Sequence, residues 1–287
     1  MNSEKRRPIH HNLLILTLGL VALALAISPQ IVAQNPRPWL GFDRNHYPGD
    51  AVLPALRQHF AFTGYWLNNP PGETTNDWQG KREILRKNNF GFLILFNGRL
   101  DTEILRANRR KIPPAVLGKR DAAAAILAAQ REHFPSGSIL FLDQEEGGRM
   151  LPEQATYLLN WTEAIAASVY KPGIYLSGQP VEDGPGKTIT TARDVRDQIT
   201  AKHLHPVALF VYQDACPPSN GCTLNPPPIT AAGTANIDVW QYAQSPRRPE
   251  ITHACAKTYA ANNDCVVAGV SDIDLSVATS NDPSHGR

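Results

Sequence analysis

The sequence predicts one α/β domain of the (β/α)8 TIM-barrel class, and two observations lead to this prediction. Short runs rich in β-branched and aromatic residues alternate with segments of helical periodicity throughout residues 39–278. Eight such runs fall within these 240 residues, which is the usual size of a barrel with eight parallel strands. An open doubly wound sheet is the structural alternative, but no glycine-rich phosphate-binding turn follows the first run.

The expected strands are the eight short apolar runs, which are bounded by turn-forming residues. In chain order they are Trp39–Asp43, Phe62–Leu67, Gly91–Asn97, Ser138–Glu145, Gly173–Ser177, Val207–Gln213, Ile237–Ala243 and Asp272–Val277.

Three of the intervening segments have the length and the apolar spacing of helices. They are Lys119–Phe134, Leu151–Tyr170 and Thr191–His203. The long connections are 68–76, 178–190 and 214–236, and each of them follows a strand. In a barrel these loops meet at the rim formed by the carboxyl ends of the strands, which is where active sites lie.

Residues 1–33 have the three parts of a secretory signal peptide. Lys5-Arg6-Arg7 gives a positive start, Leu13–Ile27 is an apolar run, and Ala33 provides a small residue before a cleavage point. A membrane anchor needs about 20 apolar residues, so a permanent span is the less favoured alternative. The arginine pair also resembles a twin-arginine signal, although the residues after it match poorly, and the export route stays open.

Cleavage would leave residues 34–287 with equal numbers of basic and acidic residues. No basic stripe is present, which argues against nucleic acid or an anionic membrane surface as a partner. We expect a secreted or periplasmic monomer, without a metal or an organic cofactor, in which 34–38 is a short linker, 39–278 is the barrel and 279–287 is a flexible polar tail.

All four cysteines lie in the last third of the sequence. Export favours disulfides over free thiols, and four cysteines allow three pairings. Short loops favour the pairs Cys216–Cys222 and Cys255–Cys265, with a crossed pairing as the open alternative. The spacing lacks the Cys-x2-Cys pattern or the nearby histidine pair that is typical of zinc sites.

Acidic residues follow the fourth expected strand, where the apolar run Ile139–Leu142 leads into Asp143, Glu145 and Glu146. The strand period of two places Asp143 and Glu145 on one face, about 6.5–7 Å apart along the chain. If that face looks into the barrel mouth, one carboxyl can be held protonated while the other is charged, as glycoside hydrolysis requires. The alternative interpretation is a surface cluster that caps a helix, and Glu146 fits that description.

Two further carboxylates belong to the ends of the barrel sequence. Asp43 ends the first expected strand and Asp274 lies in the last one. The first and last strands are neighbours in a closed barrel, so we expect Asp43, Asp143, Glu145 and Asp274 to meet at one mouth.

Several short motifs occur in an order that resembles a known family. They are Gly41-Phe42-Asp43, Asp143-x-Glu145, Pro172-Gly173-Ile174-Tyr175, Trp240-Gln241-Tyr242 and Asp274-Leu275. In this order they resemble the family 25 glycoside hydrolases, the Chalaropsis-type lysozymes. The similarity is stronger to their relatives in the glycoside-hydrolase-like family known as domain of unknown function 1906, and it covers most of 39–278.

The resemblance implies a lysozyme-like site. Glu145 is similar to the general acid of that family, and Asp143 to the carboxylate that assists the reacting sugar or its 2-acetamido group. Asp43 and Asp274 would orient and polarise the substrate. The sequence differs from the lysozyme pattern at Asn68, where many lysozymes have another acid, and in the added loop 214–236.

Aromatic and amide side chains near the strand ends are candidates for sugar binding, because sugar rings stack on aromatic faces. These substrate-binding candidates are Tyr65, Trp66, Tyr175, Gln213, Trp240, Gln241 and Tyr242. The sequence therefore predicts an exported glycoside hydrolase that acts on a cell-envelope polysaccharide such as peptidoglycan. The alternative is a catalytically silent glycan-binding or envelope-associated domain on the same barrel.

Overall fold

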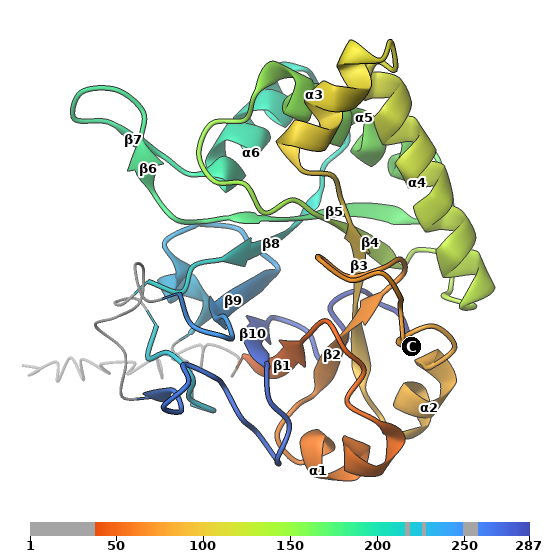
Figure 1. The fold of residues 1–287 in the computed structure, drawn as a ribbon, viewed down its shortest axis with the longest axis vertical. Coiled ribbons are helices and arrows are strands. Elements are labelled where there is room, and N and C mark those ends of the chain that lie inside the picture. The colour runs from red at the N-terminus through yellow and green to blue at the C-terminus, as the bar shows by residue number, and fades with distance from the viewer. Residues whose placement is uncertain (1–37, 216–218, 226–227, 249–257) are drawn as a thin grey trace, which may run out of the picture. The chain divides into compact units, whose positions relative to one another are not determined.

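The computed structural model describes residues 38–215, 219–225, 228–248 and 258–287, and these residues form a closed eight-stranded barrel (Figure 1). Around the barrel the strands follow the order β1-β10-β9-β8-β5-β4-β3-β2. The strands are β1 (Trp39–Asp43), β2 (Phe62–Trp66), β3 (Gly91–Asn97), β4 (Ile139–Asp143), β5 (Lys171–Ser177), β8 (Ala208–Tyr212), β9 (Val239–Ala243) and β10 (Asp274–Ala278). Each of the eight predicted runs contains most or all of one barrel strand, so the predicted fold class is confirmed. The predicted signal peptide lies outside the described residues.

The last strand runs against the others, which corrects the expectation of eight parallel strands. β10 pairs antiparallel with both β1 and β9, whereas the remaining neighbours in the barrel pair in parallel. Parallel neighbours need a crossover connection, usually a helix, to carry the chain back to the start of the barrel. The described part of the connection 244–273 contains no α-helix, and the chain enters β10 from the end at which β9 finishes.

The α-helices cover the strands of the first two thirds of the chain. The three predicted helices are present as α4 (Pro114–Arg131), α5 (Pro152–Ala166) and α6 (Thr191–Ala201). The sequence patterns missed the shorter helices α1 (Leu53–Arg57), α2 (Arg82–Lys87) and α3 (Asp101–Arg109), as well as the 3-10 helices η1 (Asp50–Val52) and η2 (Ile229–Ala232). They also missed the hairpin of β6 (Val181–Glu182) and β7 (Thr188–Ile189), which stands away from the barrel in Figure 1.

Local sequence signals explain where the longer helices begin. Pro114 and Pro152 occupy the first turns of α4 and α5, where a missing backbone N–H costs nothing. The hydroxyl of Thr190 caps α6 by accepting a hydrogen bond from the backbone N–H of Arg193 at 3.1 Å. Among the described residues, no helix combines the length and the apolar character that a membrane span requires.

Residues 279–287 differ from the expected flexible tail, because they pack under the barrel. Ser284 is fully buried, and its hydroxyl accepts a hydrogen bond from the N–H of Ile94 at 2.8 Å. Its backbone carbonyl accepts another from the N–H of Ile139 at 2.8 Å. The polar composition that suggested disorder instead supplies partners for backbone groups of β3 and for the first residue of β4.

The disulfide also differs from the prediction. Cys222 is bonded to Cys265, with a Cα–Cα distance of 5.6 Å and a sequence separation of 43. Both predicted pairs, Cys216–Cys222 and Cys255–Cys265, are therefore wrong. The preference for short loops considered distance along the chain only, whereas the fold brings the connection after β8 next to the connection before β10. Cys216 and Cys255 lie outside the described residues.

Candidate active site

One mouth of the barrel contains a cavity of about 410 Å³. All four carboxylates singled out from the sequence line it: Asp43, Asp143, Glu145 and Asp274. Asp43 and Asp143 are the last residues of β1 and β4, and Glu145 follows β4 by two residues. Asp274 is the first residue of β10, and the reversed direction of that strand brings it to the same mouth.

Gln241 on β9 connects two of these acids. Asp43 and Asp274 are direct partners in the pairing of β1 with β10. The amide Nε2 of Gln241 donates to Oδ2 of Asp43 at 3.1 Å and to Oδ2 of Asp274 at 3.4 Å. Its Oε1 accepts a hydrogen bond from the hydroxyl of Tyr175 at 2.6 Å. The amide orientation is thus fixed by a donor on one side and two acceptors on the other.

Burial controls the protonation of Asp43 and Asp274. It raises the pKa of Asp43 to about 7, against the opposing hydrogen bonds from Gln241 and Ser276. Burial also raises the pKa of Asp274 well above its usual value, and the neighbouring charge of Asp43 adds to this effect. The backbone N–H of Ser245, which donates to Asp274 at 2.5 Å, opposes it. The two adjacent carboxyls therefore resist being charged together.

Asp143 is the most isolated of the four acids. It is 5% exposed, and its Oδ1 has no hydrogen-bond partner among the described residues. Burial raises the pKa of Asp143 well above its usual value, and the charges of Glu145 and Asp43 add to the rise. The cavity therefore offers a buried acceptor atom to a ligand.

Glu145 lies nearer the solvent. It keeps an exposed surface, and the hydroxyl of Tyr212 donates to its backbone carbonyl at 3.0 Å. Loss of water around its carboxyl raises the pKa of Glu145, and the positive charge of Arg248 opposes this effect. Its raised pKa and its access to the mouth are what a proton donor to an incoming substrate needs.

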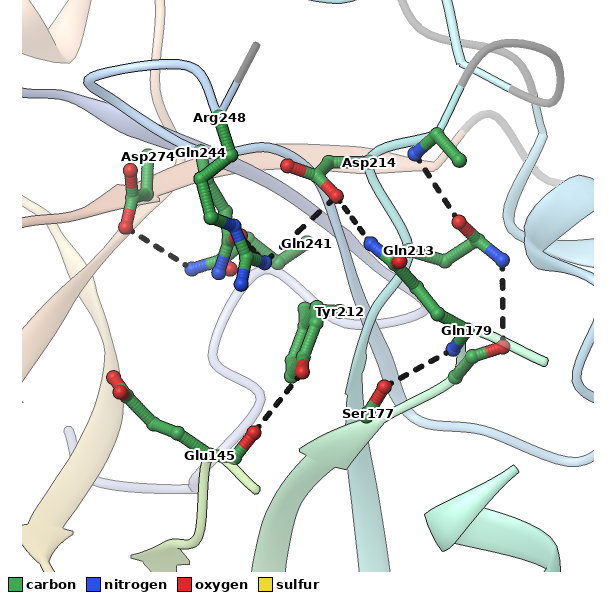
Figure 2. A network of polar contacts seen from close by, with 12 residues as sticks. Glu145, Ser177, Gln179, Tyr212, Gln213, Asp214, Gln241, Gln244, Arg248 and Asp274 are labelled. Carbon is green, nitrogen blue, oxygen red and sulfur yellow. Dashed lines mark hydrogen bonds and ion pairs between the residues drawn. The ribbon is translucent and has the colours of Figure 1, made fainter. Parts of the chain in front are cut away.

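Arg248 and Gln244 belong to the site, although the sequence analysis did not select them. Figure 2 shows the Arg248 guanidinium over the ring of Tyr212, with 5.2 Å between its central carbon and the ring centroid. Its Nη2 lies 3.9 Å from Oδ1 of the buried Asp214. The Gln244 amide donates to the Tyr175 hydroxyl at 3.0 Å. Gln244 directly follows β9, and this position at a strand end was the signal that could have identified it, whereas Arg248 lies five residues beyond the strand.

The predicted sugar-binding residues divide into two groups. Trp66, Tyr175 and Gln241 line the cavity. The remaining four, Tyr65, Gln213, Trp240 and Tyr242, do not line it. Since strand side chains alternate between faces, the inward position of Trp66 and Gln241 turns their strand neighbours outward.

The four residues outside the cavity have structural contacts instead. The Tyr65 hydroxyl donates to the carboxylate of Glu132 at 2.5 Å, and the Tyr242 hydroxyl donates to the carbonyl of Thr223 at 2.5 Å. The Trp240 indole N–H donates to the backbone carbonyl of Gln213 at 3.0 Å. Gln213 itself uses its side chain to hold the start of the next connection, since its Oε1 accepts from the N–H of Ala215 at 3.1 Å.

The rim of the cavity carries further polar residues from the connections after β1 and β2. His46 and Glu73 line it, and their side chains approach to 3.2 Å. Arg44 lines it as well and lies 4.0 Å from Asp272. Within the described parts of the chain, no group of three or more histidine, cysteine, aspartate or glutamate side chains is arranged to hold a metal ion.

The chain shares its barrel with proteins of known structure. SleM, the spore cortex lytic enzyme of Clostridium perfringens, is 13% identical, with 86% of this chain and 69% of SleM covered and a TM-score of 0.52. GHIP, a glycosyl hydrolase 25 virulence factor of Streptococcus pneumoniae, is 13% identical over 87% of this chain and 91% of GHIP, with a TM-score of 0.49. An uncharacterized protein of B. stearothermophilus is 17% identical over 84% of this chain and 95% of that protein, with a TM-score of 0.49.

No family model and no curated protein matches the sequence. At this level of identity the similarity to SleM concerns the fold alone.

Proposed function

We propose that this protein is a glycoside hydrolase that cleaves a cell-envelope polysaccharide such as peptidoglycan. The observation that carries the proposal is the cavity in which Asp143 and Glu145 lie together, one buried and one at the solvent edge. Two carboxyls with different surroundings are the equipment of glycoside hydrolysis, in which one donates a proton and the other stabilises the reacting sugar.

In this proposal each carboxyl has its own role. Glu145 donates a proton to the oxygen of the leaving sugar, and its raised pKa keeps that proton available near neutral pH. Asp143 accepts a hydrogen bond from the 2-acetamido group of the reacting sugar through its unpartnered Oδ1. Asp43 and Asp274, held by Gln241, orient and polarise the same sugar.

The ordered motifs and the barrel shared with SleM support a place beside the family 25 glycoside hydrolases, in the glycoside-hydrolase-like family known as domain of unknown function 1906. SleM is named for lysis of the spore cortex, which favours an envelope polysaccharide as the substrate class here. The export signal predicted at 1–33 would deliver the protein to that substrate, as a secreted or periplasmic monomer that needs no cofactor.

Turnover tests the proposal directly. We expect new reducing ends when the protein is incubated with purified peptidoglycan, and a bell-shaped pH profile because the carboxyls titrate as a coupled set. Glu145→Gln should reduce kcat by about 10³-fold or more, since an amide of the same shape cannot donate the proton. Asp143→Asn should reduce it severely as well. Circular dichroism would verify that both variants fold.

Glu146→Gln is the matched control. One oxygen of Glu146 accepts from the N–H of Asp101 at the start of α3 at 2.7 Å, and the other accepts from the side chains of Gln144 and Gln154. Glu146 thus holds neighbouring elements together, and we expect its variant to keep kcat within about threefold. Full activity of Glu145→Gln would overturn the proposed role of Glu145. Binding of glycans without any turnover by the wild-type protein would favour the silent glycan-binding alternative.

A further inference from the structure

A second cavity, of about 230 Å³, adjoins the first one. The two share Pro71, Asp143 and Glu145, so Glu145 lies on the boundary between them. A glycan that occupies both cavities would place a glycosidic bond beside the Glu145 carboxyl. The second cavity is therefore placed to hold the sugar on the far side of that bond.

Charge in the second cavity is unevenly distributed. Four carboxylates line it, those of Glu103, Asp143, Glu145 and Glu146, together with one guanidinium, that of Arg99. Arg99 is already neutralised by a two-point contact, because its Nε and Nη2 lie 2.6 and 2.9 Å from the two carboxylate oxygens of Asp121. Because the pKa values of Asp143 and Glu145 are raised, the negative charge that Arg99 leaves uncompensated is carried by Glu103 and Glu146.

Two buried oxygen atoms in the same cavity have no hydrogen-bond donor among the described residues. They are Oδ1 of Asp143 and Oε1 of Gln144, and the two residues are 5% and 1% exposed. Oε1 of Gln144 can only accept, whereas Oδ1 of Asp143 is taken by the 2-acetamido group of the reacting sugar in the proposed function. The Gln144 amide is oriented by its Nε2, which donates to Glu146. Buried acceptors without donors are costly unless a ligand or water supplies the donor.

We propose that the second cavity is a subsite for a sugar with a protonated free amine, such as a glucosamine residue that lacks its acetyl group. This inference rests on the proposed glycan function and adds the class of sugar. An ammonium group carries three N–H donors and a positive charge, which match the unpartnered Oε1 of Gln144 and the carboxylates of Glu103 and Glu146. An acetamido group offers one N–H and no charge, and it matches the cavity less well.

Binding of defined disaccharides tests the inference. The probes are the disaccharide of N-acetylglucosamine and its two mono-deacetylated isomers, titrated calorimetrically below pH 7, where the amine is protonated, with mass spectrometry to show that they stay intact. We expect one isomer to bind about fivefold tighter than the acetylated parent. Raising the salt concentration should reduce this advantage, because it rests on charge.

Glu103→Gln assigns the effect to this cavity. Oε2 of Glu103 accepts from the N–H of Leu100 at 3.0 Å, and an amide oxygen can keep that contact at the start of α3. We expect the variant to lose the preference for the amine while its affinity for the parent stays unchanged. The matched control is Glu83→Gln on α2, where the exposed carboxylate pairs with Arg86 outside the cavity. It should keep the preference.

The outcomes separate the two proposals. Equal affinity for all three disaccharides, or a preference that survives Glu103→Gln, overturns the amine subsite and leaves the glycan function standing. Absence of binding by every disaccharide, together with no turnover of peptidoglycan, overturns both.

Discussion

The barrel has two sides that are covered in different ways. From β1 to β5 every connection to the next barrel strand contains at least one α-helix. The described parts of the connections between β8, β9 and β10 contain no α-helix and instead have the 3-10 helix η2, a β-bridge between Val267 and Val270 and the bond Cys222–Cys265. On the helix-covered side the strands are parallel, and on the loop-covered side the last strand reverses. A closed barrel therefore does not need a helix after every strand, and its direction can change where no helix returns the chain.

The cavity draws different groups from the two sides. Asp143 and Glu145 come from the helix-covered side, at the end of β4. The loop-covered side supplies three other groups. Gln241 donates to Asp43, Gln244 donates to Tyr175, and the charge of Arg248 opposes the rise in the pKa of Glu145. The helix-covered side thus supplies the proposed reacting groups, and the loop-covered side supplies groups that orient the site residues and adjust their charge.

The largest expected effect concerns the loop-covered side. Replacing both Cys222 and Cys265 by alanine should lower the free energy of unfolding by about 4 kcal/mol, because the bond restricts a loop of 43 residues in the unfolded chain. Denaturant unfolding measures the loss. Hydrogen exchange should show increased opening around β9 and β10 and little change in α4 and α5. An equal increase in hydrogen exchange on both sides would show that the two sides do not differ in local stability.

The next effect concerns the helix-covered side. A Cβ on Gly118 of α4 would lie 2.2 Å from the backbone oxygen of Tyr157 on α5, so Gly118→Ala must push these helices apart. We expect a loss of about 3 kcal/mol in denaturant unfolding, although alanine favours a helix over glycine by about 1 kcal/mol. Ala124→Gly, on the exposed face of α4, is the control and should cost only about 1 kcal/mol. A neutral Gly118→Ala variant would disprove the close contact.

The last effect concerns the seam where β1 meets β10, and it depends on pH. The pKa of Asp43 is raised from 3.8 to about 7 in the folded protein, so the folded state holds a proton that the unfolded state releases. The stability from this proton is complete below about pH 4 and is lost as the pH rises through 7. The Asp43→Asn variant has an amide that does not titrate, so its stability does not fall in this way as the pH rises. The variant should match the wild type at pH 4 and exceed its unfolding free energy by about 4 kcal/mol at pH 8, since the pKa is raised by about 3 units. Identical pH dependence of both proteins would contradict the raised pKa.

The sequence located the strands but not all of their directions. Apolar runs bounded by turn residues identified every barrel strand, because burial on both faces requires continuous apolar sequence. The reversal of β10 depends on the path of the connection 244–273, and no local pattern encodes that path. The pairing of Cys222 with Cys265 follows from the same path, which explains why a preference for short loops failed.

The site residues that lie on strands, or close to strand ends, could be predicted from the alternation of side chains along a strand. Asp143 and Gln241 lie at inward positions near strand ends, and the same alternation could have excluded Tyr65, Trp240 and Tyr242. Arg248 lies five residues beyond β9, where no strand period applies. Its contribution to the site depends on its contact with Asp214 and its position over Tyr212, which only the folded chain reveals.

The closure of the barrel imposes an order on its folding. Asp43 on β1 pairs with Asp274 on β10, and Ser284 binds Ile94 from a position 190 residues later in the chain. During synthesis or translocation from the N-terminus, β1 and β9 are complete before β10 emerges. Until β10 pairs with them, each of the two strands has an open sheet edge. Open edges pair readily with other chains, so a chain that stops before residue 274 should aggregate rather than remain as a smaller soluble barrel.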